Sequence, residues 1–222
     1  MKKIKDVIMT NNNNNTNFWK FIKIFTIFNL NAYQILFAIL MGIIGVCLFL
    51  FLFPGGAIST AMHQILNLPG PGAGIGIIFG PFIILLSFLT YNFIKKQGAI
   101  FITCSVFGII HSIFTPIVYP TIKTVGSLGP LFLRILAIIL LGLVIEICIF
   151  IFKNQKDLIS YPVSAGISNV VILLFYWIAI FPSNKGMVAI NDTPILLVVG
   201  ILAGIAFGGL IPLGIKRFID KN

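Results

Sequence analysis

The chain has 222 residues, of which 59% are hydrophobic and only 9% are charged. Soluble domains contain about 25% charged residues and need a polar surface, so this composition excludes an ordinary soluble fold. The net charge of +10 does not indicate nucleic-acid binding, because the basic residues form short runs between apolar stretches rather than a patch with interleaved aromatics. The length suits one helical membrane domain.

The first residues are polar and basic, and they lack the apolar core and cleavage site of a signal peptide. Residues 1–17 contain the tract Asn11–Asn15, and we predict a disordered cytoplasmic tail there. In residues 18–34, Lys20 and Lys23 interrupt a run of aromatic and aliphatic side chains. This pattern predicts an amphipathic helix that lies in the membrane interface.

Residues 35–217 are expected to form an all-α membrane domain of six transmembrane helices. A helix needs about 20 apolar residues to cross the hydrocarbon core of a bilayer. Apolar runs of this length occupy residues 35–53, 71–93, 98–118, 130–152, 160–181 and 194–215.

Proline marks the expected start of three of these spans, at Pro130, Pro162 and Pro194. A proline in the first helical turn costs no hydrogen bond, because its missing N–H would have no helical partner. Ser160 and Thr193 stand where N-caps would accept hydrogen bonds from the first turn.

The orientation follows from the basic residues that flank the spans, because short cytoplasmic loops are enriched in Lys and Arg. Twelve of the fifteen basic residues fall on one side, namely Lys2, Lys3, Lys5, Lys20, Lys23, Lys95, Lys96, Lys153, Lys156, Lys216, Arg217 and Lys221. The other side has only Lys123 and Lys185, and Arg134 lies just inside the fourth span. We therefore predict a multi-pass protein of the cell membrane with both termini in the cytoplasm.

Small residues recur at four-residue spacing in three spans, which is the pattern that lets helices approach closely in lipid. Ala38 and Gly42 share a face of the first span, and the second and sixth spans carry Gly72, Gly76 and Gly80, and Gly200, Gly204 and Gly208. Such faces serve either packing within the bundle or docking of another membrane subunit. The docking interpretation applies best to Ala38 and Gly42.

The loop between the first two spans, residues 54–70, has Pro and Gly at both ends and His63 in its middle. Pro and Gly at both ends suit hinges. The loop is therefore either a lid over an outward-facing cavity or a plain connector.

Polar and aromatic groups in the outer half of the spans are the candidates for substrate binding, because ionisable residues inside a membrane are costly and indicate function by default. His111, Arg134, Tyr176 and Trp177 all fall at this depth, and His63 lies on the loop above them. Arg134 can alternatively extend to the outer headgroups, and aromatic residues often mark the interface. Whether these side chains face one another does not follow from the sequence.

Two further polar residues lie deeper. Glu146 is about 9 Å from the cytoplasmic end of the fourth span, so it should be protonated or paired within the bundle, in a structural or coupling role. Asn169 lies in the middle of the fifth span and must find a hydrogen-bond partner.

Patterns for enzyme chemistry are incomplete. Gly166-Ile167-Ser168 resembles the Gly-x-Ser of rhomboid-type intramembrane proteases, but no histidine follows His111 to act as the base. Two histidines without a carboxylate at ligand spacing do not predict a metal site. We expect no catalytic residues, metal or cofactor; a membrane-embedded enzyme of the hydrolase type, or a non-transport assembly factor, is the alternative.

Three local features are similar to the S components of energy-coupling factor (ECF) transporters, the substrate-binding membrane subunits of vitamin uptake systems. Ala38 and Gly42 look like the family's small-xxx-small docking motif. Phe79-Gly80-Pro81-Phe82 resembles the second span of the S components for hydroxymethylpyrimidine-type thiamine precursors, and residues 140–150, with Gly142 and Glu146, resemble their fourth span. Lys2 stands where nickel and cobalt S components carry histidine, which counts against a metal substrate.

This resemblance implies six short helices, capture of a small vitamin-like molecule in the outer half, and a complex with a transmembrane coupling subunit and two ATPases. The chain has no Gly-x-x-x-x-Gly-Lys run of its own, so the energy would come from the partners.

Overall fold

The computed structural model describes residues 30–53, 74–118, 131–180 and 193–221. These residues are almost entirely helical, and no strand occurs among them. They contain six helices that are long and apolar enough to cross a membrane, which confirms the predicted all-α, six-helix membrane fold. The side on which each terminus lies stays a prediction, and the predicted tail at residues 1–17 lies outside the described residues.

Three of the spans are α-helical from end to end: α3 (Ala32–Leu52), α6 (Ala99–Val118) and α7 (Leu131–Phe152). The other three contain a π-helical segment. These are η2 (Ile75–Phe79) followed by α5 (Gly80–Ile94), α8 (Asp157–Phe175) followed by η4 (Tyr176–Ile180), and α10 (Thr193–Ala203) followed by η6 (Gly204–Leu210) and α11 (Ile211–Ile219). The first span begins three residues before its expected start, so residues 32–34 belong to it rather than to an interfacial helix.

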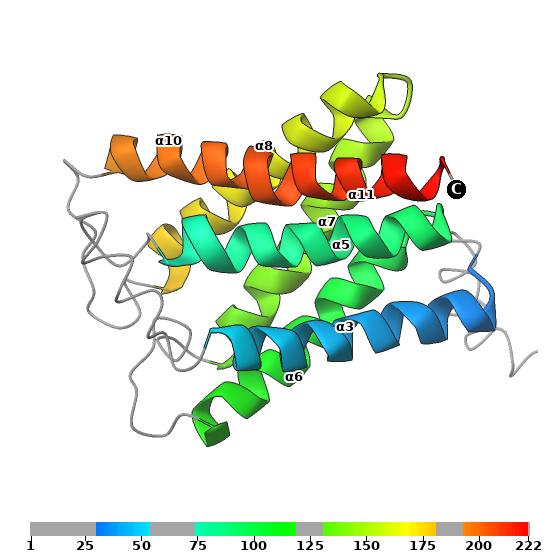
Figure 1. Cartoon of the computed structure of the whole chain (residues 1–222). Coiled ribbons are helices and arrows are strands. Elements are labelled where there is room, and N and C mark those ends of the chain that lie inside the picture. The colour runs from blue at the N-terminus through cyan, green and yellow to red at the C-terminus, as the bar shows by residue number, and fades with distance from the viewer. Residues whose placement is uncertain (1–29, 54–73, 119–130, 181–192, 222) are drawn as a thin grey trace, which may run out of the picture.

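The helices form an antiparallel bundle in two layers (Figure 1). In Figure 1, α10–α11, α5 and α3 run side by side in front, and α6, α7 and α8 cross behind them. Helix α5 contacts every other span, and 61% of its apolar stretch is buried, against 22% for α3. Helix α5 is therefore the centre of the bundle, and α3 is the span most exposed to lipid.

The two ends of the bundle differ. We call the end where α3 begins, and where residues 95–98 and 153–156 join helices, the basic end; the sequence predicts that it is cytoplasmic. At the opposite end the helices run into connections 54–73, 119–130 and 181–192, which lie outside the described residues.

Each π-helical segment ends two residues before a proline in the sequence, at Pro81, Pro182 and Pro212. Proline has no N–H, and its ring displaces the carbonyl four residues earlier. In all three spans that carbonyl belongs to a residue of the π-helical segment. In the second and sixth spans, where the described helix continues past the proline, the wider π turn accommodates the displaced carbonyl. Pro116 of α6 and Pro162 of α8 lie inside α-helical segments, so a proline alone does not impose a π turn.

The expected start of the fifth span was too late. Helix α8 begins at Asp157 with Lys156 at its N-cap position, so Ser160 and Pro162 lie inside the helix rather than at its start. Gly209 of η6 approaches the backbone of Pro162 closely: a Cβ on Gly209 would lie 2.7 Å from the Pro162 Cα. Pro194 does lie in the first turn of α10, next to Thr193, and Pro130 is outside the described residues.

The small residues of α3 pack inside the bundle. Ala38 is 0% exposed, and its carbonyl accepts a hydrogen bond of 3.1 Å from Thr103 Oγ1 of α6. A Cβ on Gly42 would lie 2.9 Å from the Thr103 carbonyl oxygen. Helix α6 therefore occupies the face that the sequence suggested for docking, and this face is not available to a partner subunit.

The glycines of the second and sixth spans also face neighbouring helices rather than lipid. Gly76 and Gly200 face each other, Gly204 lies against Ala165 and Asn169, and Gly208 lies against Ile84. Gly72 is outside the described residues. Because lipid gives little hydrophobic drive between helices, such close approach supplies the dispersion contacts that hold the bundle together.

Glu146 of α7 caps the start of α6. Its Oε1 accepts hydrogen bonds from the backbone N–H groups of Gly98 at 2.8 Å, Ile100 at 3.0 Å and Phe101 at 3.4 Å. The first N–H groups of a helix have no partner within the helix, and the positive end of the helix dipole favours an anion. The structure thus shows a structural role for Glu146, with its partner in the bundle.

A second polar cluster joins α5, α8 and α11 at the basic end. Asn92 donates to the Pro212 carbonyl at 3.1 Å and accepts a hydrogen bond from the Tyr161 hydroxyl. Nearby, Lys216 forms an ion pair of 2.6 Å with Asp157, which connects the end of α11 to the start of α8. This end of the bundle is therefore held by side chains from three spans.

Replacing Glu146 with alanine should lower the stability of the isolated protein by about 1–3 kcal/mol, because three N–H groups of α6 lose their acceptor. Glu146→Gln should cost less, since its amide oxygen still accepts. Thermal unfolding in detergent micelles measures both, with a thiol-reactive dye reporting exposure of the buried Cys104 and Cys148. Ile147→Ala, on the exposed side of α7, is the control. Equal midpoints for Glu146→Ala and the control would contradict the capping role.

Replacing Gly42 with leucine should destabilise the isolated protein by about 1–3 kcal/mol, because the new side chain meets the backbone of α6, which cannot move aside. Ile43→Leu changes the neighbouring exposed position and should have no effect. The same unfolding assay separates the two variants. An unchanged midpoint for Gly42→Leu would reopen the docking interpretation.

Candidate functional site

The candidate site is an aromatic cluster around His111 of α6, which is 5% exposed. Its imidazole stacks on Phe107 with ring centroids 5.4 Å apart and an interplanar angle of 15°. Phe79 of η2 and Phe49 of α3 approach it at 5.1 Å and 5.4 Å. Three different spans thus supply rings that enclose one polar side chain.

All of these residues lie near the end of the bundle opposite the basic end. His111 is seven residues from the end of α6, which corresponds to about 10 Å. Phe49 and Phe79 lie within about one turn of the ends of their helices. If the basic end is cytoplasmic, the cluster is in the outer half of the membrane, at the depth that the sequence predicted.

Tyr176 and Arg134 belong to the same region. Tyr176 is 1% exposed, and its ring lies 6.4 Å from that of Phe79. Arg134 is 8% exposed and lies within electrostatic range of both His111 and Tyr176. This low exposure favours a position against the bundle, and the alternative in which Arg134 extends to the headgroups stays a prediction. The structure therefore brings three of the five predicted binding residues together.

The structure does not bring the other two predicted binding residues, Trp177 and His63, into this cluster. Trp177 is half-buried and packs against the hydrophobic core, and its indole N–H has no hydrogen-bond partner among the described residues. No ring contact joins Trp177 to His111 in the described part of the chain. His63 lies outside the described residues, as does the whole 54–70 loop, so neither its role nor that of the loop as a lid is tested.

Asn169 of α8 fixes the backbone below this cluster. Its Nδ2 donates to the Gly76 carbonyl of η2 at 2.7 Å and to the Gly200 carbonyl of α10 at 2.6 Å. Gly76 needs this donor, because the Gly80 N–H is bonded to the Ile75 carbonyl and the next residue, Pro81, has no N–H. The predicted partner of Asn169 is thus the backbone of two neighbouring spans.

Gly80 allows the second span to reach Asn169. A Cβ on Gly80 would collide with the Oδ1 atom of Asn169. Any other side chain would therefore have to displace the Asn169 amide, which lies beside Phe79, the preceding residue and a member of the aromatic cluster. Gly80 and Pro81 thus place a site residue without contacting the site themselves.

The arrangement favours binding of a flat ring over catalysis. Aromatic side chains at these distances interact through ring edges and faces, and an imidazole among them adds a hydrogen-bonding nitrogen. Ser168, of the Gly-x-Ser sequence, is fully buried, and its hydroxyl lies beside the Cys148 thiol of α7 rather than beside a histidine that could act as a base. No three His, Cys, Asp or Glu side chains of the described residues lie close enough to hold a metal ion. The expectation that the chain is not an enzyme stays a prediction.

The three phenylalanines around His111 were not predicted as site residues. Phe107 was detectable, because it precedes His111 by four residues and shares its helix face. Phe79 lies in the Phe-Gly-Pro-Phe segment, which drew attention for its family resemblance alone. Phe49 is one of 22 phenylalanines, and nothing in its local sequence distinguishes it.

Comparisons with known proteins supply no relative from which a role for this cluster can be transferred. No family model, no curated protein and no solved structure matches the chain. The functional assignment therefore depends on the geometry of the described residues.

Asn169→Leu should destabilise the bundle by about 1–3 kcal/mol, because the Gly76 carbonyl loses its donor in a medium without water. Gly80→Ala should act in the same direction, since it displaces the same amide. Ile167→Leu, two residues away and exposed, is the control. Thermal unfolding in detergent micelles compares the midpoints of these three variants with that of the wild type. If Asn169→Leu matches the control, the hydrogen bonds to Gly76 and Gly200 do not support the bundle.

Proposed function

We propose that this chain is the substrate-binding membrane subunit of a vitamin-type uptake transporter of the ECF class. The observation that carries the proposal is the enclosure of His111 by Phe49, Phe79 and Phe107, with Tyr176 and Arg134 beside it. A polar side chain held among rings inside a membrane domain costs stability, so it indicates a binding function by default.

The substrate in this proposal is a small heterocyclic molecule that enters from outside. It binds against the aromatic cluster through ring contacts, and His111 and Arg134 provide polar contacts for its substituents. Trp177 and His63 belong to the proposed site as outer contacts. A hydroxymethylpyrimidine-type thiamine precursor fits this description, and the resemblance of residues 79–82 and 140–150 makes it the first candidate to test.

The partners in this proposal are a transmembrane coupling subunit and two ATPases, with both termini of the chain in the cytoplasm. Ala38 and Gly42 are not proposed as the docking face, because α6 covers them. Leu36, Leu40 and Ile44 point outward from α3, which is the least covered span. In the proposed complex the coupling subunit contacts this outward side of α3.

The sharpest test is His111→Phe. Phenylalanine keeps an aromatic ring against Phe79 and Phe107 and removes the imidazole nitrogens. Its ring is slightly larger, which offsets part of the gain from burying an apolar group, so the variant should fold with nearly unchanged thermal stability. Its affinity for substrate should fall by more than about tenfold, as for other central contacts in a desolvated site. Mass spectrometry of small molecules that co-purify with the protein, followed by binding assays with hydroxymethylpyrimidine and thiamine, measures the loss.

Phe114→Leu, on an exposed position of the same helix, is the matched control. Tryptophan emission gives an independent signal, because Trp19 and Trp177 are the only tryptophans of the chain. In a Trp19→Phe background the substrate should change the emission of Trp177. If His111→Phe retains its bound molecule and loses stability instead, His111 is a packing residue and the proposed site is wrong.

A further inference from the structure

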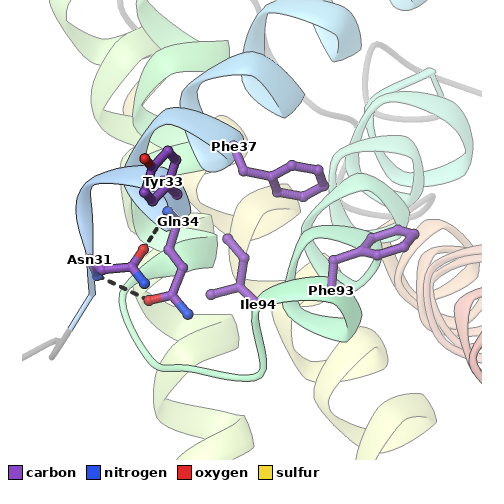
Figure 2. Close-up of a pocket in the computed structure, with 6 residues that line it drawn as sticks. All are labelled: Asn31, Tyr33, Gln34, Phe37, Phe93 and Ile94. Atoms are coloured by element: carbon purple, nitrogen blue, oxygen red, sulfur yellow. Dashed lines mark hydrogen bonds between the residues drawn. The ribbon is translucent and has the colours of Figure 1, made fainter.

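A groove lies at the basic end of the bundle, between the start of α3 and the end of α5, far from the proposed substrate site. Its volume is about 360 Å³, and it is lined by Asn31, Tyr33, Gln34, Phe37, Phe93 and Ile94 (Figure 2). In Figure 2 the side-chain amides of Asn31 and Gln34 lie at one end of the groove and the rings of Phe37 and Phe93 at the other. The groove therefore has a polar and an apolar end.

The polar end presents hydrogen-bond donors. The Asn31 side-chain oxygen accepts the Gln34 N–H at 2.9 Å, and the Gln34 side-chain oxygen accepts the Asn31 N–H at 3.0 Å. Because this capping box uses both side-chain oxygens, both amides turn their NH₂ groups outward as donors. No acidic residue lies in the first turn of α3.

Positive charge surrounds the same end. Lys95 and Lys96 directly follow Ile94, the last residue of the groove wall. Among the described residues the basic end carries seven basic side chains, Lys95, Lys96, Lys153, Lys156, Lys216, Arg217 and Lys221, against three acidic ones, Glu146, Asp157 and Asp220. Lys95 lies 3.7 Å from Asp220 and Lys216 lies 2.6 Å from Asp157, so the excess positive charge remains after these ion pairs are counted. A ligand with an anionic head therefore has a favourable potential at the polar end of the groove.

The apolar end continues into the lipid-facing surface. Phe37 and Phe93 lie with ring centroids 5.6 Å apart, and Phe93 is 58% exposed. This surface suits a hydrocarbon chain that runs along the bilayer normal.

We propose that this groove binds one anionic phospholipid of the cytoplasmic leaflet, phosphatidylglycerol being the simplest. The phosphate and glycerol head lie against the Asn31 and Gln34 amides within reach of the charge on Lys95 and Lys96. One acyl chain covers Phe37 and Phe93. The lipid would hold α3, the span with the fewest contacts inside the bundle, against α5.

Gln34→Glu tests the proposal most directly. A glutamate retains the oxygen that accepts the Asn31 N–H, so the start of α3 and the fold should be preserved. It also replaces the NH₂ donor with a negative charge that repels a phosphate. Native mass spectrometry of the full chain in micelles, with dioleoylphosphatidylglycerol or dioleoylphosphatidylcholine added, counts the lipids retained.

The wild type should retain one phosphatidylglycerol in preference to phosphatidylcholine, and Gln34→Glu should weaken this retention by at least about tenfold. Lys95→Gln/Lys96→Gln should weaken it similarly. Lys153→Gln/Lys156→Gln removes the same charge from the other connection at this end and should leave retention unchanged. Thermal unfolding verifies that every variant is folded.

Three outcomes would overturn the proposal. The wild type could show no preference for phosphatidylglycerol, which would leave the groove to neutral lipid or to the chain's own first 29 residues. Gln34→Glu could retain phosphatidylglycerol as the wild type does. The two double variants could lose it equally, which would mean that the overall charge of the basic end attracts the lipid rather than the groove.

Discussion

The carboxamide of Asn169 is the interaction on which the arrangement of the second, fifth and sixth spans depends. It supplies the donor that the Gly76 carbonyl lacks, and it joins the Gly200 carbonyl to the same point. In lipid no water can replace such a donor, so an unsatisfied carbonyl would cost far more than at a protein surface. The π turn before Pro81 is therefore tolerated only because α8 places an amide beside it, and the position of Phe79 in the aromatic cluster follows from that turn.

Polar side chains bond to the backbone of a neighbouring span at two other places, through a carboxylate in one case and an amide in the other. Glu146 satisfies the N–H groups at the start of α6, and Asn92 satisfies the Pro212 carbonyl of α11. At Asn169 and Glu146 a backbone group left open by a proline-associated break or a helix end is bonded by a side chain from a neighbouring span, and Asn92 adds a hydrogen bond to a carbonyl within the first turn of α11. These hydrogen bonds fix the position of each helix along the bundle axis. The apolar contacts between helix faces, including the glycine faces, do not fix this position, because they are not directional. Packing and polar contacts thus have separate roles in this bundle.

The sequence predicted the number, type and approximate bounds of the spans, because the thickness of the hydrocarbon core imposes a minimum apolar length. It did not predict which way each span faces. Ala38 and Gly42 were predicted as a docking face for a partner, but α6 covers them, since a small-residue face is the same surface whether it meets a partner or a helix of the same bundle. Arg134, His111 and Tyr176 were predicted from depth alone, and their proximity depends on helix rotation. The enclosing rings of Phe49 and Phe79 come from spans distant in sequence, and among 22 phenylalanines no local signal separates them.

The two ends of the bundle are held together by different kinds of contact. At the basic end, Glu146, the Asn92 cluster and the Lys216–Asp157 ion pair tie five of the six spans to one another. At the opposite end the described contacts around His111 are aromatic, and ring contacts tolerate sliding and reorientation because they have no single required geometry. Two of the residues there, Phe79 and Tyr176, belong to π-helical segments, where helical hydrogen bonding is already weakened. Rearrangement at the His111 end therefore costs less than rearrangement at the basic end, and the proposed binding function would use this asymmetry by opening the bundle at the His111 end.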